Sequence, residues 1–291
     1  MTTLILGLGQ QLSQPQKKAW SWQATALALI AAASAIAFYV ATAHSLRAGW
    51  IAGASVALAT AVGALPVAFA RKMPVAFTDS LMLVGGGIMA TETLGGVVPE
   101  AFHSMQNLSP NAMDAACALF TVVLLGAMAF GKWQASVQKI GSAKGSDHER
   151  LGILLFALAM TLQNLPEGIA AGVSMAGSTH GASLTFGISL QDIPEGFAVA
   201  TALWRAGASP LKATLGGIAS GLVELFGALL GAAAMGVSTT LLPVLMGLAA
   251  GAMLWVIGKE LGPKLLTGRG LGAVYFLGGL LIALGFNQLP M

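Results

Sequence analysis

The chain has 291 residues, of which 56% are hydrophobic and only 9% are charged, and its mean hydropathy is +0.80. A soluble domain carries roughly 25% charged residues, so this composition excludes an ordinary soluble protein and indicates a chain that lies mostly in a lipid bilayer. The formal net charge is only +3, and the basic residues lie between apolar runs. They therefore indicate membrane topology, and a nucleic-acid partner is excluded.

Apolar runs of about 20 residues are long enough to cross a bilayer as helices. The chain contains nine such runs, which predicts an all-α polytopic membrane protein with nine transmembrane helices. The predicted spans, in chain order, cover residues 22–44, 49–70, 79–102, 112–131, 151–176, 183–204, 212–234, 241–260 and 271–288.

The first span admits a second interpretation. Lys17 and Lys18, the following apolar stretch, and Ala41 and Ala43 in "ATAHS" are also typical of a cleaved signal peptide, although the apolar region is long for one. Cleavage would leave eight spans in the same orientation.

The distribution of Lys and Arg predicts the orientation. With the N-terminus in the cytoplasm, all of the 14 basic residues except Arg47 fall on the inner side, as expected from the excess of positive charge in cytoplasmic loops. Short loops and a compact chain favour a bacterial inner membrane, with the C-terminus in the periplasm.

A weak internal repeat is visible at an offset of 164 residues. "GIM" at 87–89, followed by Pro99, matches "GAM" at 251–253, followed by Pro263, and "GAL" at 63–65 matches "GAL" at 227–229. The matched spans are predicted to run in opposite directions. Inverted repeats of this kind are typical of transporters whose substrate site lies near the membrane midplane.

Carboxylates occur in the middle of several spans, namely Glu92, Glu167, Asp192, Glu195 and Glu224. A carboxylate at the bilayer centre costs at least ~2.5 kcal/mol, so each requires a partner or a function. Lys259 is the basic residue that reaches a comparable depth, and one ammonium group cannot pair with five carboxylates. Protons or metal ions are therefore expected to neutralise the group.

Two variants of one motif carry most of these polar residues: "TLQNLPEGIAAG" at 161–172 and "SLQDIPEGFAVA" at 189–200. The Gln and Glu of each copy are four residues apart and share one helix face, and the Asn or Asp lies roughly 100° round the helix. Pro166 and Pro194 are expected to bend their helices and free a backbone carbonyl. Such oxygen ligands suit a hard or borderline divalent cation. The alternative is that the amides only hydrogen-bond neighbouring helices and the prolines only kink them.

The paired "QNLPEG" and "QDIPEG" helices, followed by a Glu within "GLVELFGALLG" and by "GLAAGAMLWVIGKELGP", resemble the ZIP (Zrt/Irt-like) family of metal transporters, in its bacterial type. The resemblance covers about residues 50–290. It implies an eight-helix core in which two inverted three-helix repeats flank a central helix pair. Residues 49–291 would form this transporter domain, and residues 1–48 would add an N-terminal tail and one extra helix.

The resemblance also implies a metal site. Its residues would be Met89, Gln163, Asn164, Glu167, Gln191, Asp192, Glu195 and Glu224. The implied function is alternating-access transport of divalent metal into the cytoplasm, with zinc as the family default. Family members usually carry His where Gln163 stands, and an oxygen-rich site is better suited to manganese or iron(II) than an imidazole site.

The position of Lys259 admits two interpretations. Lys259 either reaches the membrane interface or pairs with Glu260 or Glu224, in which case it replaces one cation of the family's two-metal arrangement.

The expected partners are divalent metal ions and the lipid bilayer, and a homodimer is an alternative to a monomer. No prosthetic cofactor is expected.

Two other classes of protein compete with a metal carrier. A proton-coupled or ion-conducting transporter would use the same carboxylates without metal. An intramembrane metalloenzyme is disfavoured because no span contains an HExxH-type spacing, so the chain is not expected to be an enzyme.

Overall fold

The computed structural model describes residues 22–70, 74–108, 111–139, 147–267 and 271–286. The chain divides into two units, Met1–Ala41 and Thr42–Met291, and the second unit carries the predicted site. Within the described residues the regular structure is helical throughout, which confirms the prediction of an all-α fold.

The helices follow one another in the order Trp22–Phe69 (α2), Val75–Glu92 (α3), Val98–Leu108 (α4), Ala112–Lys139 (α5), Asp147–Gly177 (α6), Gly181–Arg205 (α7), Pro210–Val237 (α8), Leu242–Val256 (α9), Gly262–Thr267 (α10) and Leu271–Phe286 (α11). Two π-helical segments, Thr93–Val97 (η1) and Ile257–Leu261 (η3), join α3 to α4 and α9 to α10. A short 3₁₀ segment, Thr239–Leu241 (η2), precedes α9.

Among the described residues, six helical stretches are long and apolar enough to cross a membrane, and the apolar helix Leu271–Phe286 is shorter. The stretches are Ala43–Phe69, Ala76–Leu108, Ala112–Gln134, Leu151–Gly177, Pro210–Val237 and Thr239–Leu265. They fall on predicted spans, so a polytopic helical membrane protein is confirmed, whereas the count of nine stays a prediction. Helix α7 covers the predicted span 183–204 but is not in this set, because Gln191, Asp192 and Glu195 lower its hydropathy.

The predicted break between the first two spans, at residues 45–48, is not seen. Helix α2 runs from Trp22 to Phe69 without interruption. The reason is local: Ser45, Leu46, Arg47 and Ala48 include neither Pro nor Gly, and polarity alone does not end a helix.

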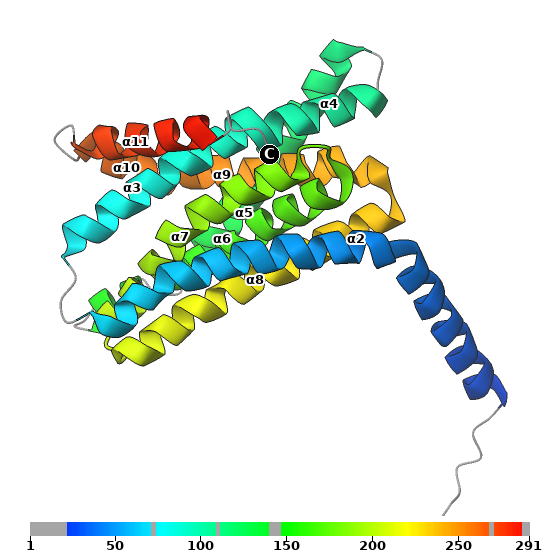
Figure 1. The fold of residues 1–291 in the computed structure, drawn as a ribbon, viewed down its shortest axis with the longest axis horizontal. Helices are drawn as coiled ribbons and strands as arrows, with labels where there is room; N and C mark the ends of the chain where they lie inside the picture. Colours follow the sequence, from blue (N-terminus) through cyan, green and yellow to red (C-terminus); the bar gives the residue numbers. More distant parts are fainter. Residues whose placement is uncertain (1–21, 71–73, 109–110, 140–146, 268–270, 287–291) are drawn as a thin grey trace, which may run out of the picture. The chain divides into compact units, whose positions relative to one another are not determined.

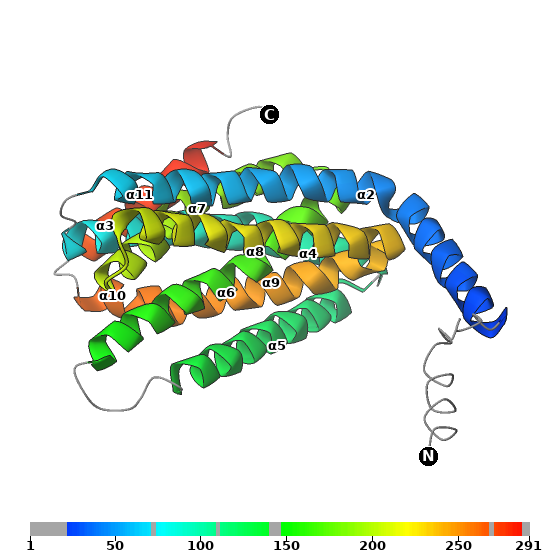
Figure 2. The same cartoon turned by 90° about the horizontal axis from the view of Figure 1, so that it is seen from below.

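Helices α6, α7 and α8 pack against one another in the second unit, and α6 also packs against α9. On one flank α3 lies beside α11 (Figure 1), and on another α5 lies beside α9 (Figure 2). Pro166 and Pro194 lie inside the continuous helices α6 and α7. The two motif-bearing helices are therefore neighbours in the interior of the bundle.

The offset of 164 residues seen in the sequence recurs in the structure. The π-helical segments η1 and η3 begin at residues 93 and 257 and end at residues 97 and 261, so both their ends are separated by that offset. A π-helical turn is rare and commonly marks a functional position in a helix. Its occurrence at equivalent places supports two structural repeats, one containing α3 and the other containing α9.

Helix crossings at glycines repeat with the same offset. A Cβ on Gly63 of α2 would overlap the carbonyl oxygen of Ile193 of α7, and a Cβ on Gly196 would overlap that of Thr60. In the second repeat, Gly227 of α8 approaches the carbonyl oxygen of Leu165 of α6 in the same way, and Gly168 approaches that of Glu224. Gly63 and Gly227 are 164 residues apart, as are Thr60 and Glu224. The central helices α6 and α7 therefore each cross the first helix of one repeat at a matching point.

In a second set of crossings the two glycines are again 164 residues apart, whereas the residues that they approach are 153 apart. Gly87 of α3 approaches the carbonyl oxygen of Phe276 of α11, and Gly251 of α9 approaches that of Val123 of α5. Glycine permits backbones to approach this closely, as is usual for helices packed in membranes.

Candidate metal site

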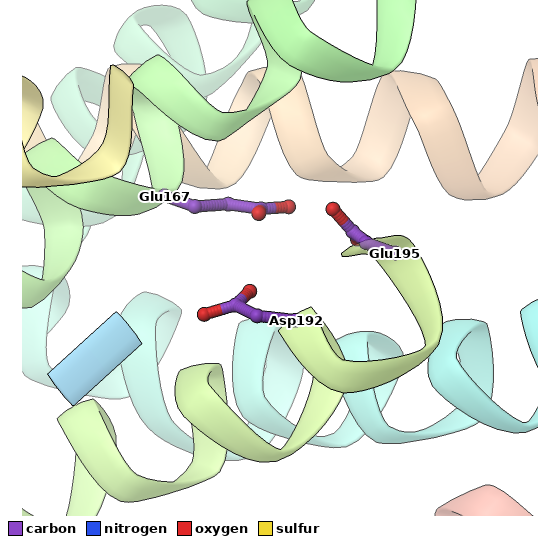
Figure 3. A group of neighbouring side chains, drawn as sticks. All are labelled: Glu167, Asp192 and Glu195. Atoms are coloured by element: carbon purple, nitrogen blue, oxygen red, sulfur yellow. The ribbon is translucent and has the colours of Figure 1, made fainter. Parts of the chain in front are cut away.

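Three carboxylates from the two central helices converge in the interior of the bundle. Glu167 of α6 and Asp192 and Glu195 of α7 each offer an oxygen, and these oxygens all lie within 4.8 Å of one another. Figure 3 shows the carboxyl groups of Glu167 and Glu195 pointing toward each other, with Asp192 beside them. The exposed fractions are 0% for Glu167 and Asp192 and 6% for Glu195. We refer to these three residues as the carboxylate cluster.

Gln163 joins the cluster to Met89. Its side-chain nitrogen donates to Glu167 Oε1 at 3.2 Å and to Glu195 Oε1 at 3.4 Å, and it lies 3.9 Å from Met89 Sδ. Gln163 and Glu167 meet because they are one helical turn apart on α6. The structure therefore brings the predicted residues Met89 and Gln163 to one side of the cluster.

Asn164 and Glu224 lie on the side where α8 packs. Asn164 donates through Nδ2 to the carbonyl oxygen of Ser220 at 3.2 Å. Gly168 fits against the backbone of Glu224, so α8 passes within one turn of Glu167. Both Asn164 and Glu224 are fully buried.

Many acceptor oxygens of this region make no hydrogen bond within the described part of the chain. They are Asn164 Oδ1, Glu167 Oε2, Gln191 Oε1, Asp192 Oδ1 and Oδ2, Glu195 Oε2 and Glu224 Oε2. Buried polar atoms are nearly always satisfied in folded proteins, so a set of buried acceptors of this kind favours a bound cation or bound protons. Carboxylate and amide oxygens are the ligands preferred by hard divalent cations.

The basic side chains described near this depth do not neutralise the cluster. Lys259 is exposed, which agrees with a side chain that reaches the membrane interface. The side chain of Glu260 lies outside the described residues. The ion pair recorded in the described residues joins Lys264 to Asp79 at 2.8 Å, and both side chains are partly exposed.

The sequence interpretation missed one polar neighbour of the site, Thr60. Its hydroxyl donates to Glu224 Oε1 at 2.6 Å, and both residues are fully buried. The two residues are 164 positions apart, so Thr60 occupies in the first repeat the position that Glu224 occupies in the second. The internal repeat was therefore the signal that could have found it.

Fold and site together define a class: an integral membrane protein of packed apolar helices that encloses a buried cluster of carboxylate and amide groups. Comparison with known proteins assigns the family. Residues 134–285 match the family described as ZIP Zinc transporter. The chain is 37% identical over 228 residues to the zinc transporter GufA of Myxococcus xanthus, an alignment that covers 75% of this chain and 89% of that protein.

Two further relatives share shorter regions. The zinc transporter ZIPB of Bordetella bronchiseptica is 37% identical over 131 residues, which are 40% of this chain and 42% of that protein. The zinc transporter ZIP11 of Xenopus tropicalis is 41% identical over 120 residues, which are 38% of this chain and 36% of that protein. The chain therefore belongs to the ZIP family, as its motifs predict, and it is a membrane transporter and not an enzyme.

Proposed function

We propose that the chain transports divalent metal ions into the cytoplasm through the site formed by Met89, Gln163, Asn164, Glu167, Gln191, Asp192, Glu195 and Glu224. The observation that carries this proposal is the convergence of buried, unsatisfied oxygens around the carboxylate cluster. A divalent cation would satisfy these oxygens and would offset the cost of burying the carboxylates inside the membrane.

Zinc is the first candidate substrate, because GufA and ZIPB are described as zinc transporters. The ligands nevertheless consist of carboxylates, amides and one thioether. An imidazole is the nitrogen ligand that favours zinc, whereas carboxylate-rich sites also bind manganese and iron(II). We therefore propose a site that accepts zinc together with other divalent cations.

Uptake by proteoliposomes containing the full chain, across a panel of divalent metals, tests this function. The wild type should show saturable uptake, and the double variant Glu167→Ala, Glu195→Ala should show none. Asp114, which is exposed in the first turn of α5, provides the matched control Asp114→Asn. Normal uptake by the double variant would disprove the site. Proton movement by the wild type that persists without divalent metal would favour the metal-independent transporter instead.

We further propose that the transporter works by alternating access. The cluster is enclosed, and the structural repeats provide two related arrangements of the same helices around it, which is the usual basis of such a mechanism. Ala171 and Met160 lie on α6 on opposite sides of the cluster, and both are buried. Cysteines placed at these two positions should change accessibility in opposite directions when metal is added. Labelling of both in one state, or single-channel currents, would contradict alternating access.

The orientation and the domain division are part of the same proposal. We place the N-terminus in the cytoplasm of a bacterial cell and the C-terminus in the periplasm, with residues 49–291 as the transporter domain. A reporter fused to either end, active in only one compartment, tests the orientation. A chain that begins at residue 49 and retains uptake would support the division, whereas a folded but inactive one would contradict it.

A further inference from the structure

A polar cavity of about 320 Å³ opens near the junction of α3, η1 and α4. Its lining includes Glu92, Glu100, His103, His180 and Ser183, all of which carry groups that can bind a cation. In the proposed orientation this cavity faces the outside. The cluster lies deeper along α6 and α7.

Glu92 lies between this cavity and the cluster. The side chain is only 2% exposed although it lines the cavity. Its carboxyl group lies against Gly187 of α7, where a Cβ would overlap it. Gly187 precedes Gln191 by four residues, a rise of about 6 Å along a helix, and Glu92 follows Met89 by three residues on α3. Glu92 is therefore about one turn from the site on both helices.

The internal repeat carries an apolar side chain at the equivalent position. At the offset of 164 residues, Glu92 corresponds to Val256, which is buried and lines a small pocket with Met89, Gln163 and Glu195. Equivalent positions of the two repeats therefore carry a carboxylate, Glu92, on one side of the site and an apolar side chain, Val256, on the other.

The two cavities at opposite ends of the bundle also differ in charge. Glu100 in the first cavity corresponds, at the same offset, to Lys264. Lys264 lines a second cavity, of about 280 Å³, together with Asp79 and Arg205. Because Lys264 is paired with Asp79, the second cavity keeps the single positive charge of Arg205, whereas the first carries the two carboxylates Glu92 and Glu100. A cleft of one charge sign raises the local concentration of oppositely charged ions.

We propose that Glu92 binds divalent cations transiently on their way from the first cavity to the carboxylate cluster. It contacts the cation only along the approach route and is not a ligand of the final site. This inference rests on the proposed transport function.

The test is metal uptake by proteoliposomes with the full chain as wild type, Glu92→Gln and Glu92→Val. Valine is chosen because Val256 occupies the equivalent position of the other repeat. Both variants should raise the KM for uptake about tenfold, in line with the local enrichment that a charged cleft provides. The maximal rate should stay within about twofold. Asp114→Asn, which removes an acid outside the cavity, should leave both values unchanged.

Three additional measurements separate this role from a structural one. Equilibrium affinity for the same metal, measured by calorimetry, should change by less than about twofold in Glu92→Gln, since the final ligands are intact. Gly187→Ala keeps the charge but displaces the carboxyl group, so it should raise the KM in the same direction, and Glu92→Asp should restore part of the wild-type KM.

Unchanged KM in both Glu92 variants would overturn the inference, and so would a fall in maximal rate or affinity of the size caused by Glu167→Ala. If Glu92→Gln and Glu92→Val do not fold, the KM of Gly187→Ala decides, and a wild-type value overturns the inference. Absence of divalent-metal uptake by the wild type would instead disprove the proposed function itself.

Discussion

Replacing Glu195 by glutamine should stabilise the metal-free protein and abolish its stabilisation by metal. The three cluster oxygens lie within 4.8 Å of one another. At an effective dielectric constant of about 20, two unit charges at that distance repel by about 3.5 kcal/mol. The substitution removes two of the three pairs while it keeps the acceptor oxygen that binds the Gln163 nitrogen.

Relaxation of the side chains and proton binding by the metal-free cluster offset much of this repulsion, so we expect a gain of about 2 kcal/mol in unfolding free energy. For a chain of this size that corresponds to a Tm about 4 °C higher. A metal at 100 times its Kd stabilises a protein by about 2.7 kcal/mol. The wild type should therefore show a rise of at least about 5 °C on metal addition, and Glu195→Gln should show little or none.

Thermal denaturation in detergent, with and without zinc or manganese, measures both effects. Asp114→Asn should behave as the wild type, because its carboxylate is exposed and outside the cluster. A metal-free Tm that falls in Glu195→Gln, together with an intact metal-dependent rise, would show that Glu195 is a structural group. The interpretation of the cluster as a cation site would then be wrong.

Three other outcomes are expected from the same structure. Gln163→His should raise zinc affinity in calorimetry, because a neutral imidazole binds zinc better than an amide, and an unchanged affinity in a folded variant would mean that this side chain does not face the metal. Gly279→Ala should lower the unfolding free energy by about 1–3 kcal/mol, since its Cβ would overlap a carbonyl oxygen of α3. The control Gly278→Ala has open space around it and should not destabilise the protein. Equal effects of the two variants would contradict the close crossing of α3 and α11. Asp79→Asn should cost less than about 1 kcal/mol, because its ion pair with Lys264 is partly exposed, and a larger loss would indicate that this pair holds α3 and α10 together.

Local spacing was enough to predict which side chains share a helix face. Gln163 and Glu167 are one turn apart, and the structure shows them joined by a hydrogen bond. The repeated motif also indicated that α6 and α7 would meet, since each alone leaves a carboxylate without ligands or counter-ions. These predictions succeeded because they depend on helix geometry and on the cost of a buried charge, which the sequence contains directly.

Long-range contacts were harder to predict. The bond from Thr60 to Glu224 joins α2 to α8, and no local pattern marks a threonine in an apolar run as a partner for a distant carboxylate. The continuous helix through residues 45–48 was likewise missed, because charge patterning reports on membrane topology and not on backbone hydrogen bonding. The crossings at Gly63 and Gly196 depend on how backbones approach in three dimensions.

A comparison of equivalent positions in the two halves shows that the site is not symmetric in charge. Gln163 and Gln191 correspond to each other, as do Glu167 and Glu195, but Asn164 corresponds to Asp192 and Thr60 to Glu224. Each of the two unlike pairs places a neutral side chain in one half and a carboxylate in the other. Four carboxylates therefore surround the site, and making both unlike pairs acidic would give six, whereas making both neutral would give two. Four negative charges are neutralised by two divalent cations, or by one divalent cation and two protons. Six would exceed the charge of two such cations, at a depth where each uncompensated carboxylate costs at least about 2.5 kcal/mol.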